Sequence, residues 1–459
     1  MKKKIITAFL GVATVATLAS CGGGKARPNF ICPEEFDEDT EVTVKFWNTM
    51  GQNNQVYLNE TIAEFEDMYP NIKIESEYIG GYDDVRDQIL MNMGVQQYPD
   101  VAYCYPDHVA LYNEAQITVS LDDVMSNPKY GFGGSELKFQ SPAYDDFVKA
   151  FIEEGAQFGD GLTYTVPFLR STEALFYNKT FFEDHNLKVP TTWDEMWDVC
   201  ANIKEIDPKS IPLGYDSEGN LFITLAETYG YGYTSPNSFD FNNEGMRGLM
   251  KTFKEKYDLG YFTTSELNGG QYTNNLMTDV SAEVKAYMCV GSTAGATYQA
   301  NSAGAFETGV TSIPHAPGKD LKVISQGPSL VLFKNENPQQ VLATWLWTQY
   351  LLSDLVQARF GLATGYLPVT NSAANLPAYQ SEIAKANGYK DGIAAAAAKQ
   401  ALAQRENYFT SAVFVGSSTA RDEVGALFVQ IMQLASNNDD DISRIFKNAI
   451  DECYYQSGL

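Results

Sequence analysis

Residues 166–179 read VPFLRSTEALFYNK, and this stretch decides how the rest of the chain is organised. Pro167 fixes its own φ and donates no backbone hydrogen bond, which suits a sheet edge or a crossing between two units. The apolar run Ala174–Tyr177 is typical of a buried strand. Four polar residues lie between them, so the stretch contains either a solvated turn or a polar shelf where the chain crosses between domains.

The sequence before this stretch alternates between strand and helix patterns. Glu41–Trp47 and Ile72–Tyr78 alternate polar and apolar residues, whereas Gln55–Tyr69 carries apolar residues at helical spacing. A second amphipathic helix over Asp83–Gln96 leads to a third strand that opens at Pro99. This β-α-β-α-β order with short links predicts a parallel sheet flanked by helices. Ligands of such sheets bind beyond the carboxyl ends of the strands.

The later sequence predicts a second unit of the same kind. The length of 459 residues exceeds one ordinary domain, so two lobes are expected. Thr192 and Glu195 form a capping box at a clear helix start. Further strands and helices follow, and the tail from Ala378 to Tyr455 has an almost entirely helical pattern.

Composition excludes several classes of protein. The formal net charge of −26 argues against nucleic acid or an anionic membrane surface as a broad partner, because both require a basic footprint. The three histidines are scattered, and no cysteine pair has CxxC spacing, so no metal site is expected. The sequence has no GxSxG, HExxH or Walker A motif. We therefore expect a monomeric binding protein without cofactor, metal or catalytic residues.

The N-terminus is typical of an exported lipoprotein. Lys2–Lys4 precede a short apolar segment, Ile5–Leu18, and the small residues before Cys21 resemble a bacterial lipobox. Residues 1–20 are then a signal peptide, Cys21 carries the lipid, and residues 21–40 form a flexible tether. The protein is expected at the extracellular face of the cell membrane; an ordinary signal peptide cut nearby is the alternative.

Candidate ligand-binding residues lie mainly where strands end. Flat rings can cover the C–H faces of sugars, and planar polar groups can bond their hydroxyls. Each residue taken singly is equally consistent with packing, but their common placement favours a site. The candidates are Trp47, Tyr82, Asp83, Tyr105, Asp107, Arg170, Ser171, Tyr231, Ser292 and Tyr366.

Seven segments in order carry a resemblance to a known family. They are Val42–Met50 (VTVKFWNTM), Glu64–Ile74 (EFEDMYPNIKI), Gly81–Asp84 (GYDD), Pro99–Val101 (PDV), Pro167–Lys179 (PFLRSTEALFYNK), Pro190–Glu195 (PTTWDE) and Thr364–Val369 (TGYLPV). Together they resemble the extracellular solute-binding proteins of ABC importers, in particular the carbohydrate group called family 1 and its glycerol-3-phosphate- and sugar-binding lipoproteins. Single motifs are weak, but seven in order are a strong signal.

The resemblance implies a two-lobed α/β fold of the periplasmic-binding-protein type II, with parallel-rich sheets and a hinge of three segments. The hinge crossings are expected near Val166–Ser171, Ile324–Pro328 and Thr364–Val369. Lobe 1 would then comprise residues 41–167 and 326–368, and lobe 2 residues 168–325 and 369–459. The stretch quoted first becomes the first crossing and part of the cleft floor.

The resemblance also implies ligand contacts at Tyr82, Ser171, Ser292 or Thr293, Gly327 and Tyr366. This chain departs from the family pattern at two positions. A glutamate after the third strand falls on Pro106, beside Asp107, and an arginine that faces phosphate falls near Phe414, with Arg421 close by. Losing an arginine for an aromatic ring favours a neutral sugar, whereas Arg170 could meet a phosphate through two hydrogen bonds.

The sequence therefore predicts a lipid-anchored receptor that captures a mono- or oligosaccharide by clamshell closure and delivers it to an ABC permease. A glycerol-3-phosphate or glycerophosphodiester receptor of the same fold is the alternative. A surface glycan hydrolase is a third, weaker reading.

Overall fold

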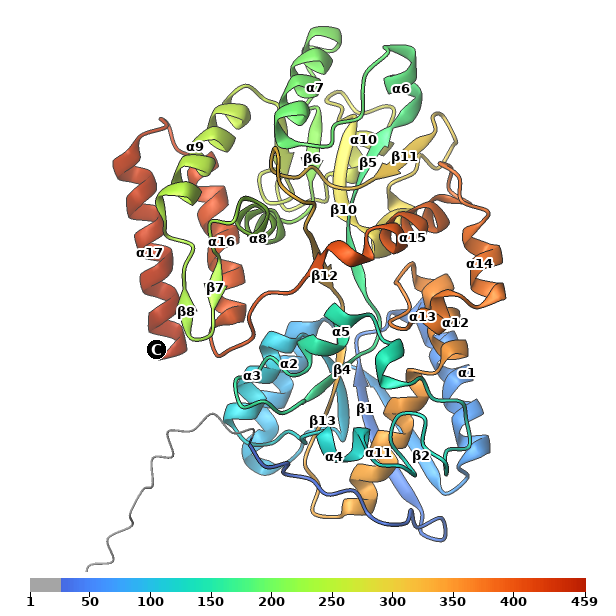
Figure 1. The fold of residues 1–459 in the computed structure, drawn as a ribbon. Coiled ribbons are helices and arrows are strands. Elements are labelled where there is room, and N and C mark those ends of the chain that lie inside the picture. Colours follow the sequence, from blue (N-terminus) through green and yellow to red (C-terminus); the bar gives the residue numbers. More distant parts are fainter. Residues whose placement is uncertain (1–25) are drawn as a thin grey trace, which may run out of the picture.

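The computed structural model describes residues 26–459. The predicted signal peptide and Cys21 lie outside the described residues. The chain forms two lobes, each built around its own sheet, with one lobe above the other in Figure 1. Within the described part, no helix is both long and apolar enough to cross a membrane.

The first lobe contains the sheet β2-β1-β3-β13-β4, in which β1 pairs in parallel with β2 and β3, as the sequence predicts. Strand β13 is antiparallel to both β3 and β4. The elements of this lobe are β1 (Val42–Asn48), α1 (Gln52–Met68), β2 (Ile72–Tyr78), α2 (Tyr82–Asn92), η1 (Met93–Val95), β3 (Val101–Cys104), α3 (Pro106–Glu114), α4 (Asp122–Met125), η2 (Tyr144–Asp146), α5 (Lys149–Glu154), β4 (Thr165–Pro167), β13 (Ser329–Leu332), α11 (Pro338–Leu351), α12 (Asp354–Thr364) and α13 (Asn371–Ala374).

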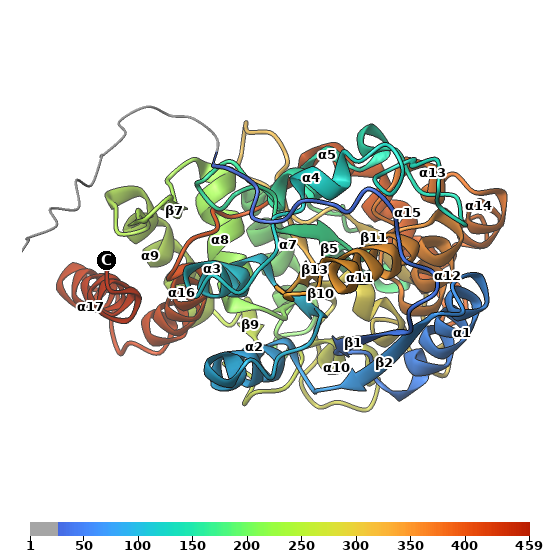
Figure 2. The ribbon, with the colours of Figure 1, turned by 90° about the horizontal axis from the view of Figure 1, so that it is seen from below.

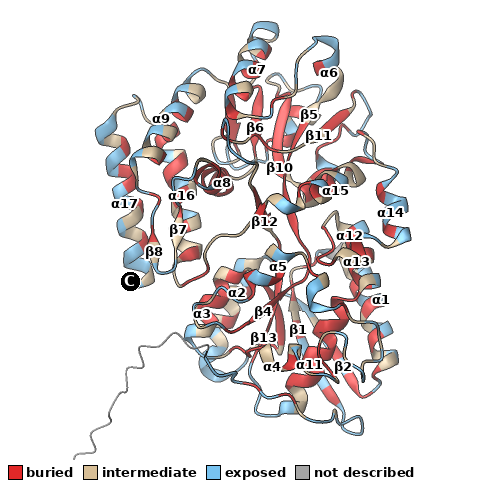
Figure 3. Cartoon of the chain, viewed as in Figure 1, coloured by how far each residue is buried: buried red, intermediate tan, exposed pale blue. Residues whose placement is uncertain are grey.

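Strand β3 shows why helices cover both faces of this sheet. All four of its residues are buried, and successive side chains point to opposite faces. Val101 and Tyr103 join the core beneath α1 and α11, whereas Ala102 and Cys104 join the core beneath α2 and α3. A strand buried on both faces reads as a continuous apolar run. Figure 3 shows the same burial along the strands of both lobes.

The second lobe contains the sheet β14-β12-β5-β10-β6-β9, with β11 also paired to β5. Helix α15 packs on one face of β5, and α8 and α16 pack together beside β6 and β12. The elements of this lobe are β5 (Ser171–Asn178), α6 (Lys179–Asp184), α7 (Trp193–Ile206), β6 (Leu213–Tyr215), α8 (Glu218–Tyr229), β7 (Thr234–Ser235), β8 (Ser238–Phe239), α9 (Glu244–Asp258), β9 (Phe262–Thr264), α10 (Asn274–Thr278), β10 (Met288–Ser292), η3 (Thr293–Tyr298), β11 (Thr308–Thr311), β12 (Val323–Gln326), α14 (Pro377–Ile383), α15 (Ile393–Ala403), η4 (Arg405–Asn407), β14 (Tyr408–Phe409), α16 (Ser417–Met432) and α17 (Asp439–Ser457).

The chain changes sheets within the stretch quoted first. Pro167 ends β4 at the edge of the first sheet, and Ser171 opens β5 in the second. A second change occurs between β12 and β13, where Gly327 has φ +124°, a conformation that favours glycine. The backbone N–H and C=O of Arg170 both bond to Leu367, so a third segment lies against the same point.

The third segment leaves the first lobe later than the expected Val369. Asn371 Nδ2 still donates to the carbonyl oxygen of Asp146 at 2.9 Å, and the N–H of Ser372 donates to the Asp146 carboxylate at 3.1 Å. Helix α14 then packs against both α12 and α15, and α15 lies on β5 of the second lobe. The tail is also less helical than its pattern predicts, because β14 pairs in parallel with β12.

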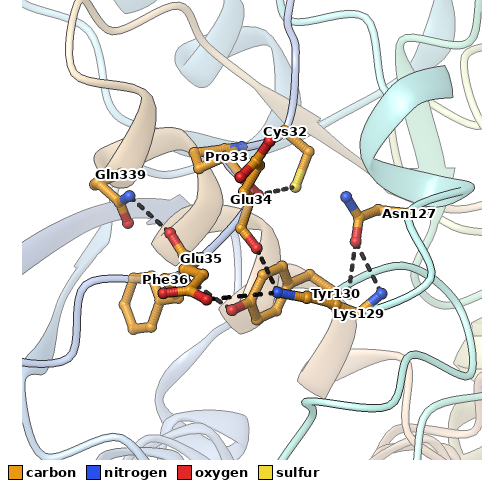
Figure 4. Close-up of polar contacts among 9 residues, drawn as sticks. All are labelled: Cys32, Pro33, Glu34, Glu35, Phe36, Asn127, Lys129, Tyr130 and Gln339. Atoms are coloured by element: carbon orange, nitrogen blue, oxygen red, sulfur yellow. Dashed lines mark hydrogen bonds and ion pairs between the residues drawn. The ribbon is translucent and has the colours of Figure 1, made fainter.

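Residues 26–39, here called the N-terminal strap, differ from the expected flexible tether. They run over the first lobe, as Figure 2 shows from below. Lys129 Nζ donates to the carbonyl oxygen of Glu34 at 2.9 Å, and the N–H of Phe36 donates to Tyr130 Oη at 2.8 Å (Figure 4). Gln339 Nε2 donates to the carbonyl oxygen of Glu35 at 2.9 Å. Backbone groups bonded in this way hold the strap in one path.

Candidate functional site

Two adjoining cavities lie between the lobes beside the crossing segments. The first, here called the hinge cavity, has a volume of about 200 Å³. The first lobe contributes residues from the start of α3 and from α5, and the second contributes residues from α8, β12 and the segment before α16. Its lining is Tyr105, Pro106, Asp107, Glu154, Arg170, Ser217, Asn220, Tyr233, Ile324, Ser325, Gln326, Gly327, Ser411, Ala412, Val413, Ser417 and Arg421.

Arg170 forms a buried network in the wall of the hinge cavity and is 1% exposed. Its Nη1 donates to the carbonyl oxygens of Gly327 and Pro328 at 2.7 and 2.8 Å. Its Nη2 donates to Glu154 Oε2 at 2.6 Å and to Ser329 Oγ at 2.9 Å. Burial raises the pKa of Glu154, and Arg170 acts against this shift. Both terminal nitrogens therefore serve the protein itself, which counts against a two-bond contact from Arg170 to phosphate.

Arg421 is the second guanidinium of the hinge cavity and is placed differently. It lies in the first turns of α16, and its one side-chain hydrogen bond within residues 26–459 runs from Nη1 to Asn220 Oδ1 at 2.7 Å. Burial opposes its charge, but Asp107 and the nearby phenols of Tyr233 and Tyr105 outweigh burial and raise its pKa. Since no other hydrogen bond holds this side chain within the described part of the chain, its remaining N–H groups are available to a ligand.

Four residues of the hinge cavity carry a buried polar atom that has no hydrogen-bond partner among the described residues. Leaving such an atom unpaired costs about 1–3 kcal/mol. A serine hydroxyl changes direction by one χ1 rotation, so it can turn to a ligand at little cost. The four atoms are Arg170 Nε, Tyr233 Oη, Ser325 Oγ and Ser411 Oγ.

The second cavity, here called the adjoining groove, has a volume of about 1000 Å³. Ser217, Asn220 and Gln326 line both cavities, so the two adjoin. Most of the groove belongs to the second lobe, and α1 and the end of α12 close it from the first. Its lining is Asn54, Glu173, Asp216, Ser217, Asn220, Gly270, Gln271, Tyr272, Asn274, Asn275, Gly291, Ser292, Ala294, Gly295, Tyr298, Gln299, Gln326, Thr364 and Tyr366.

Two carboxyl groups lie in the wall of the adjoining groove, Glu173 buried and Asp216 half-buried. Glu173 accepts from Tyr215 Oη at 2.5 Å and from Asn220 Nδ2 at 3.1 Å, and burial raises its pKa to about 7 against these hydrogen bonds. Asp216 accepts from the N–H and the hydroxyl of Thr273 at 2.7 and 2.6 Å, and burial raises its pKa as well. Hydrogen-bond donors of the protein thus hold both carboxyl groups.

The sequence-predicted site residues lie partly in the two cavities and partly outside them. Tyr105, Asp107, Arg170 and Gly327 line the hinge cavity, and Ser292 and Tyr366 line the adjoining groove. Tyr82 lies beside them, with its ring 4.3 Å from that of Tyr105, and it bonds to Tyr366. The remaining six line neither cavity: Trp47, Asp83, Ser171, Tyr231, Thr293 and Phe414.

The six residues outside the cavities have other structural roles. Trp47 packs against the core beneath α2 and α3. Asp83 is exposed and pairs with Arg86 at 2.9 Å, and Tyr231 stacks on Tyr229. Ser171 is buried and pairs with Gln326 between β5 and β12. The hydroxyl of Thr293 accepts from the N–H of Thr172 at 3.2 Å, and Phe414 is buried against Phe239.

Sequence reasoning missed several lining residues. Glu154 ends a short helix, and Ser411 follows the two-residue strand β14 in a tail whose pattern predicts helices, so neither stands at the end of a predicted strand. The segment 216–220 gave a signal, because its residues DSEGN faintly resemble a calcium loop. The structure uses it instead as the cap of α8, where Ser217 Oγ accepts from the N–H of Asn220 at 3.3 Å.

The described residues contain neither a group of side chains that could bind a metal ion nor a disulfide bond. Among residues 26–459, no group of three or more histidine, cysteine or acidic side chains could hold a metal ion. Cys32, Cys104, Cys200, Cys289 and Cys453 are all free and buried, where a cysteine packs as a small apolar side chain.

Two α/β lobes joined by crossing segments, with polar cavities between them, are the architecture of hinged two-lobed binding proteins. The chain belongs to the family of bacterial extracellular solute-binding proteins, whose model matches residues 60–387. A putative binding protein of Brucella abortus is 24% identical over 264 residues, which span 56% of this chain and 60% of that relative.

Solved structures agree with this fold. The chain resembles UgpB from Mycobacterium tuberculosis in complex with glycerophosphocholine, with a TM-score of 0.72 and 18% identity over 90% of this chain and 98% of that one. It also resembles the sugar-binding protein MalE from Xanthomonas citri, with a TM-score of 0.69 and 19% identity over 90% and 97% of the two chains. The predicted family and two-lobed α/β fold are thereby confirmed.

Proposed function

We propose that this protein is the extracellular receptor of an ABC importer and captures a carbohydrate between its lobes. One observation carries the proposal: four residues lining the hinge cavity hold buried polar atoms without partners among the described residues. Ligand hydroxyls are suited to such atoms, because each hydroxyl can donate and accept a hydrogen bond. The ring of Tyr105 in the same wall provides a flat surface for sugar C–H groups.

Charge in the two cavities favours a neutral ligand. Asp107 and Glu154 balance Arg170 and Arg421 in the lining of the hinge cavity, so its formal charge is zero. The described lining of the adjoining groove contains acidic side chains but no lysine or arginine. A phosphate ester would therefore meet no net positive field on entering, whereas a neutral sugar is indifferent to the balance.

Capture follows from the position of the cavities between the lobes. Tyr105 and Asp107 come from the first lobe, whereas Asn220 and Arg421 come from the second. A ligand that bonds to both sets stabilises the closed arrangement over an open one by its differential affinity. The permease, with two transmembrane subunits and a cytoplasmic ATPase, would recognise the closed form and receive the ligand.

The ligand is bound without being transformed. The acidic side chains of the adjoining groove are held by hydrogen bonds from the protein, which suits a structural role better than proton transfer. Lipid on Cys21 would keep the receptor at the extracellular face of the membrane. We expect the receptor to act as a monomer. A glycan hydrolase would release reducing ends from glycans on incubation, and a receptor would release none.

Arg421 supports one alternative ligand class. Its partly unused guanidinium could bond to the phosphate of a glycerol phosphate or a glycerophosphodiester. The structural likeness to a protein solved with glycerophosphocholine is compatible with this alternative.

A thermal-shift screen of sugars and glycerophosphates tests the proposal. A ligand at a hundredfold excess over its dissociation constant should stabilise the folded protein by about 2.7 kcal/mol. The carbohydrate proposal predicts that a sugar raises the melting temperature of the wild type and of Arg421→Gln, because residues other than Arg421 make most of the contacts. A shift with phosphate esters alone, abolished by Arg421→Gln, would establish the alternative instead.

A further inference from the structure

We infer that the receptor is held with one particular face of its first lobe towards the lipid bilayer, because the N-terminal strap leaves only a short length of chain between the lipid and the folded protein. This inference rests on the proposed lipid at Cys21. It adds which surface of the protein lies next to the lipid headgroups.

The strap begins at a defined point on the surface of the first lobe. The N–H of Ala26 donates to the carbonyl oxygen of Asp160 at 3.0 Å. Two residues further on, Pro28 lines a hollow together with Ser126, which follows α4. These four residues, here called the anchor face, are all exposed or half-buried. The chain that leads back to Cys21 therefore leaves the protein at the anchor face.

The first lobe holds the strap just beyond the anchor face. The N–H of Asn29 donates to Ser120 Oγ at 2.7 Å, and the N–H of Cys32 donates to Asp123 Oδ2 at 2.7 Å. The side chains of Phe30 and Cys32 are buried in the core of this lobe. Because the strap is held by these hydrogen bonds and buried side chains, its residues add nothing to the reach of the chain between the lipid and the protein.

The chain between Cys21 and Ala26 is short compared with the protein. Ala26 is the fifth residue after Cys21, and a fully extended chain of that length spans at most about 18 Å. A compact chain of roughly 430 residues has a radius of gyration of about 22 Å. Tipping the molecule by a quarter turn would lift Ala26 from the bilayer by more than the chain can reach. The half of the molecule opposite the anchor face therefore stays away from the bilayer.

The length of the chain, rather than attraction to lipid, sets this orientation. The protein has a formal net charge of −26, and Asp160 and Asp123 lie close to the start of the strap. Anionic headgroups would repel such a surface. Repulsion would extend the chain between Cys21 and Ala26, but it could not turn another face towards the bilayer.

The anchor face adjoins a point where the two lobes meet. Asp160 belongs to the loop between α5 and β4, and the same loop carries Gln157. Gln157 Nε2 donates to Thr410 Oγ1 of the second lobe at 3.2 Å. The side of the molecule that faces the bilayer therefore includes part of the second lobe as well as the first.

Energy transfer from a fluorescent label to an acceptor lipid tests the inference. The lipidated full-length protein is placed in phosphatidylcholine vesicles that contain an acceptor-labelled phosphatidylethanolamine. The donor is attached at Ser126→Cys on the anchor face or, in a separate sample, at Lys188→Cys in the link between α6 and α7, far from the strap in Figure 1. The cysteines of the described chain are buried, so the label reacts with the introduced one. We expect roughly fivefold more transfer from Ser126→Cys than from Lys188→Cys.

Two insertions of equal length separate the hold of the strap from the length of the chain. About thirty glycine and serine residues between Lys25 and Ala26 span about 30 Å on average, so the ratio of transfer should fall below about two. The same insertion between Asp39 and Thr40, just after the strap, is the matched control. The strap still holds Ala26 on the first lobe in this variant, so the ratio should stay at its original value.

The outcomes separate the inference from the proposed lipid anchor. Equal transfer from the two positions without an insertion would overturn the inference and leave the anchor standing. A lower ratio in both insertion variants would show that the strap does not hold Ala26. An unchanged ratio in both would show that the short chain does not set the orientation, and either result overturns the inference. A purified protein whose mass contains no lipid would overturn the proposed anchor at Cys21, and the inference with it.

Discussion

Replacing Arg170 by methionine removes the guanidinium that joins the crossing segments and puts an unbranched apolar side chain in its place. Arg170 is 1% exposed, and its terminal nitrogens bond to Gly327, Pro328, Ser329 and the carboxylate of Glu154. The variant leaves that carboxylate buried without its partner. Breaking a buried ion pair from one side costs about 3–5 kcal/mol, so we expect a loss of that size in the free energy of unfolding at neutral pH.

Urea denaturation followed by tryptophan fluorescence measures this loss. The double variant Arg170→Met/Glu154→Gln should recover part of it, with a coupling of about 1–3 kcal/mol, because the buried charge is gone. Burial already raises the pKa of Glu154 from its usual 4.5. In Arg170→Met its protonation should come still more easily, so the loss should shrink as the pH falls towards 4.5. A single variant within 1 kcal/mol of wild type, or a loss independent of pH, would refute this account.

The remaining predictions concern three other sites. Glu173 has a pKa of about 7 in the fold against a usual 4.5, so its contribution to stability is present below pH 4.5 and lost as the pH rises through 7. Wild type should therefore lose about 3 kcal/mol relative to Glu173→Gln across this window in urea titrations, and parallel curves would contradict the prediction. Gly327→Ala should destabilise the fold by about 2 kcal/mol or more, because a Cβ there meets the carbonyl oxygen of Leu169 at 2.3 Å. Gly159 also has a positive φ, +86°, but has open space around it, so the control variant Gly159→Ala should lose only about 1 kcal/mol of stability. Cys21→Ala should move the protein from the membrane to the soluble fraction on cell fractionation, and continued membrane attachment would disprove lipidation at this residue.

Sequence reasoning located the parts of the fold that depend on local pattern. Pro167 and the apolar run that follows it mark the change of sheets. Proline has no backbone N–H to donate and therefore suits the edge of a sheet, whereas a buried strand has apolar side chains on both faces. Tyr105 and Asp107 were found because residues after strand ends lie where the two lobes meet, and Tyr366 was also implied by the family resemblance.

The residues that sequence reasoning missed come into place through long-range folding. Ser411 was not singled out, and Arg421 was noted only as lying close to Phe414. Both belong to a tail that pairs β14 with β12 before it returns to the cleft, and helical periodicity does not register such a return. Phe414 stands only seven residues from Arg421, yet it packs against Phe239 in the core. Within an irregular segment, position along the chain does not determine which side chain faces the cleft.

The N-terminal strap makes the two lobes mechanically unequal. Its described hydrogen bonds run to the first lobe, through Lys129, Tyr130 and Gln339 among others (Figure 4). Any load applied at the N-terminus thus passes into the first lobe without crossing the hinge. With lipid on Cys21, as proposed, the first lobe would be the one tied to the membrane, and closure would be a movement of the second lobe relative to it.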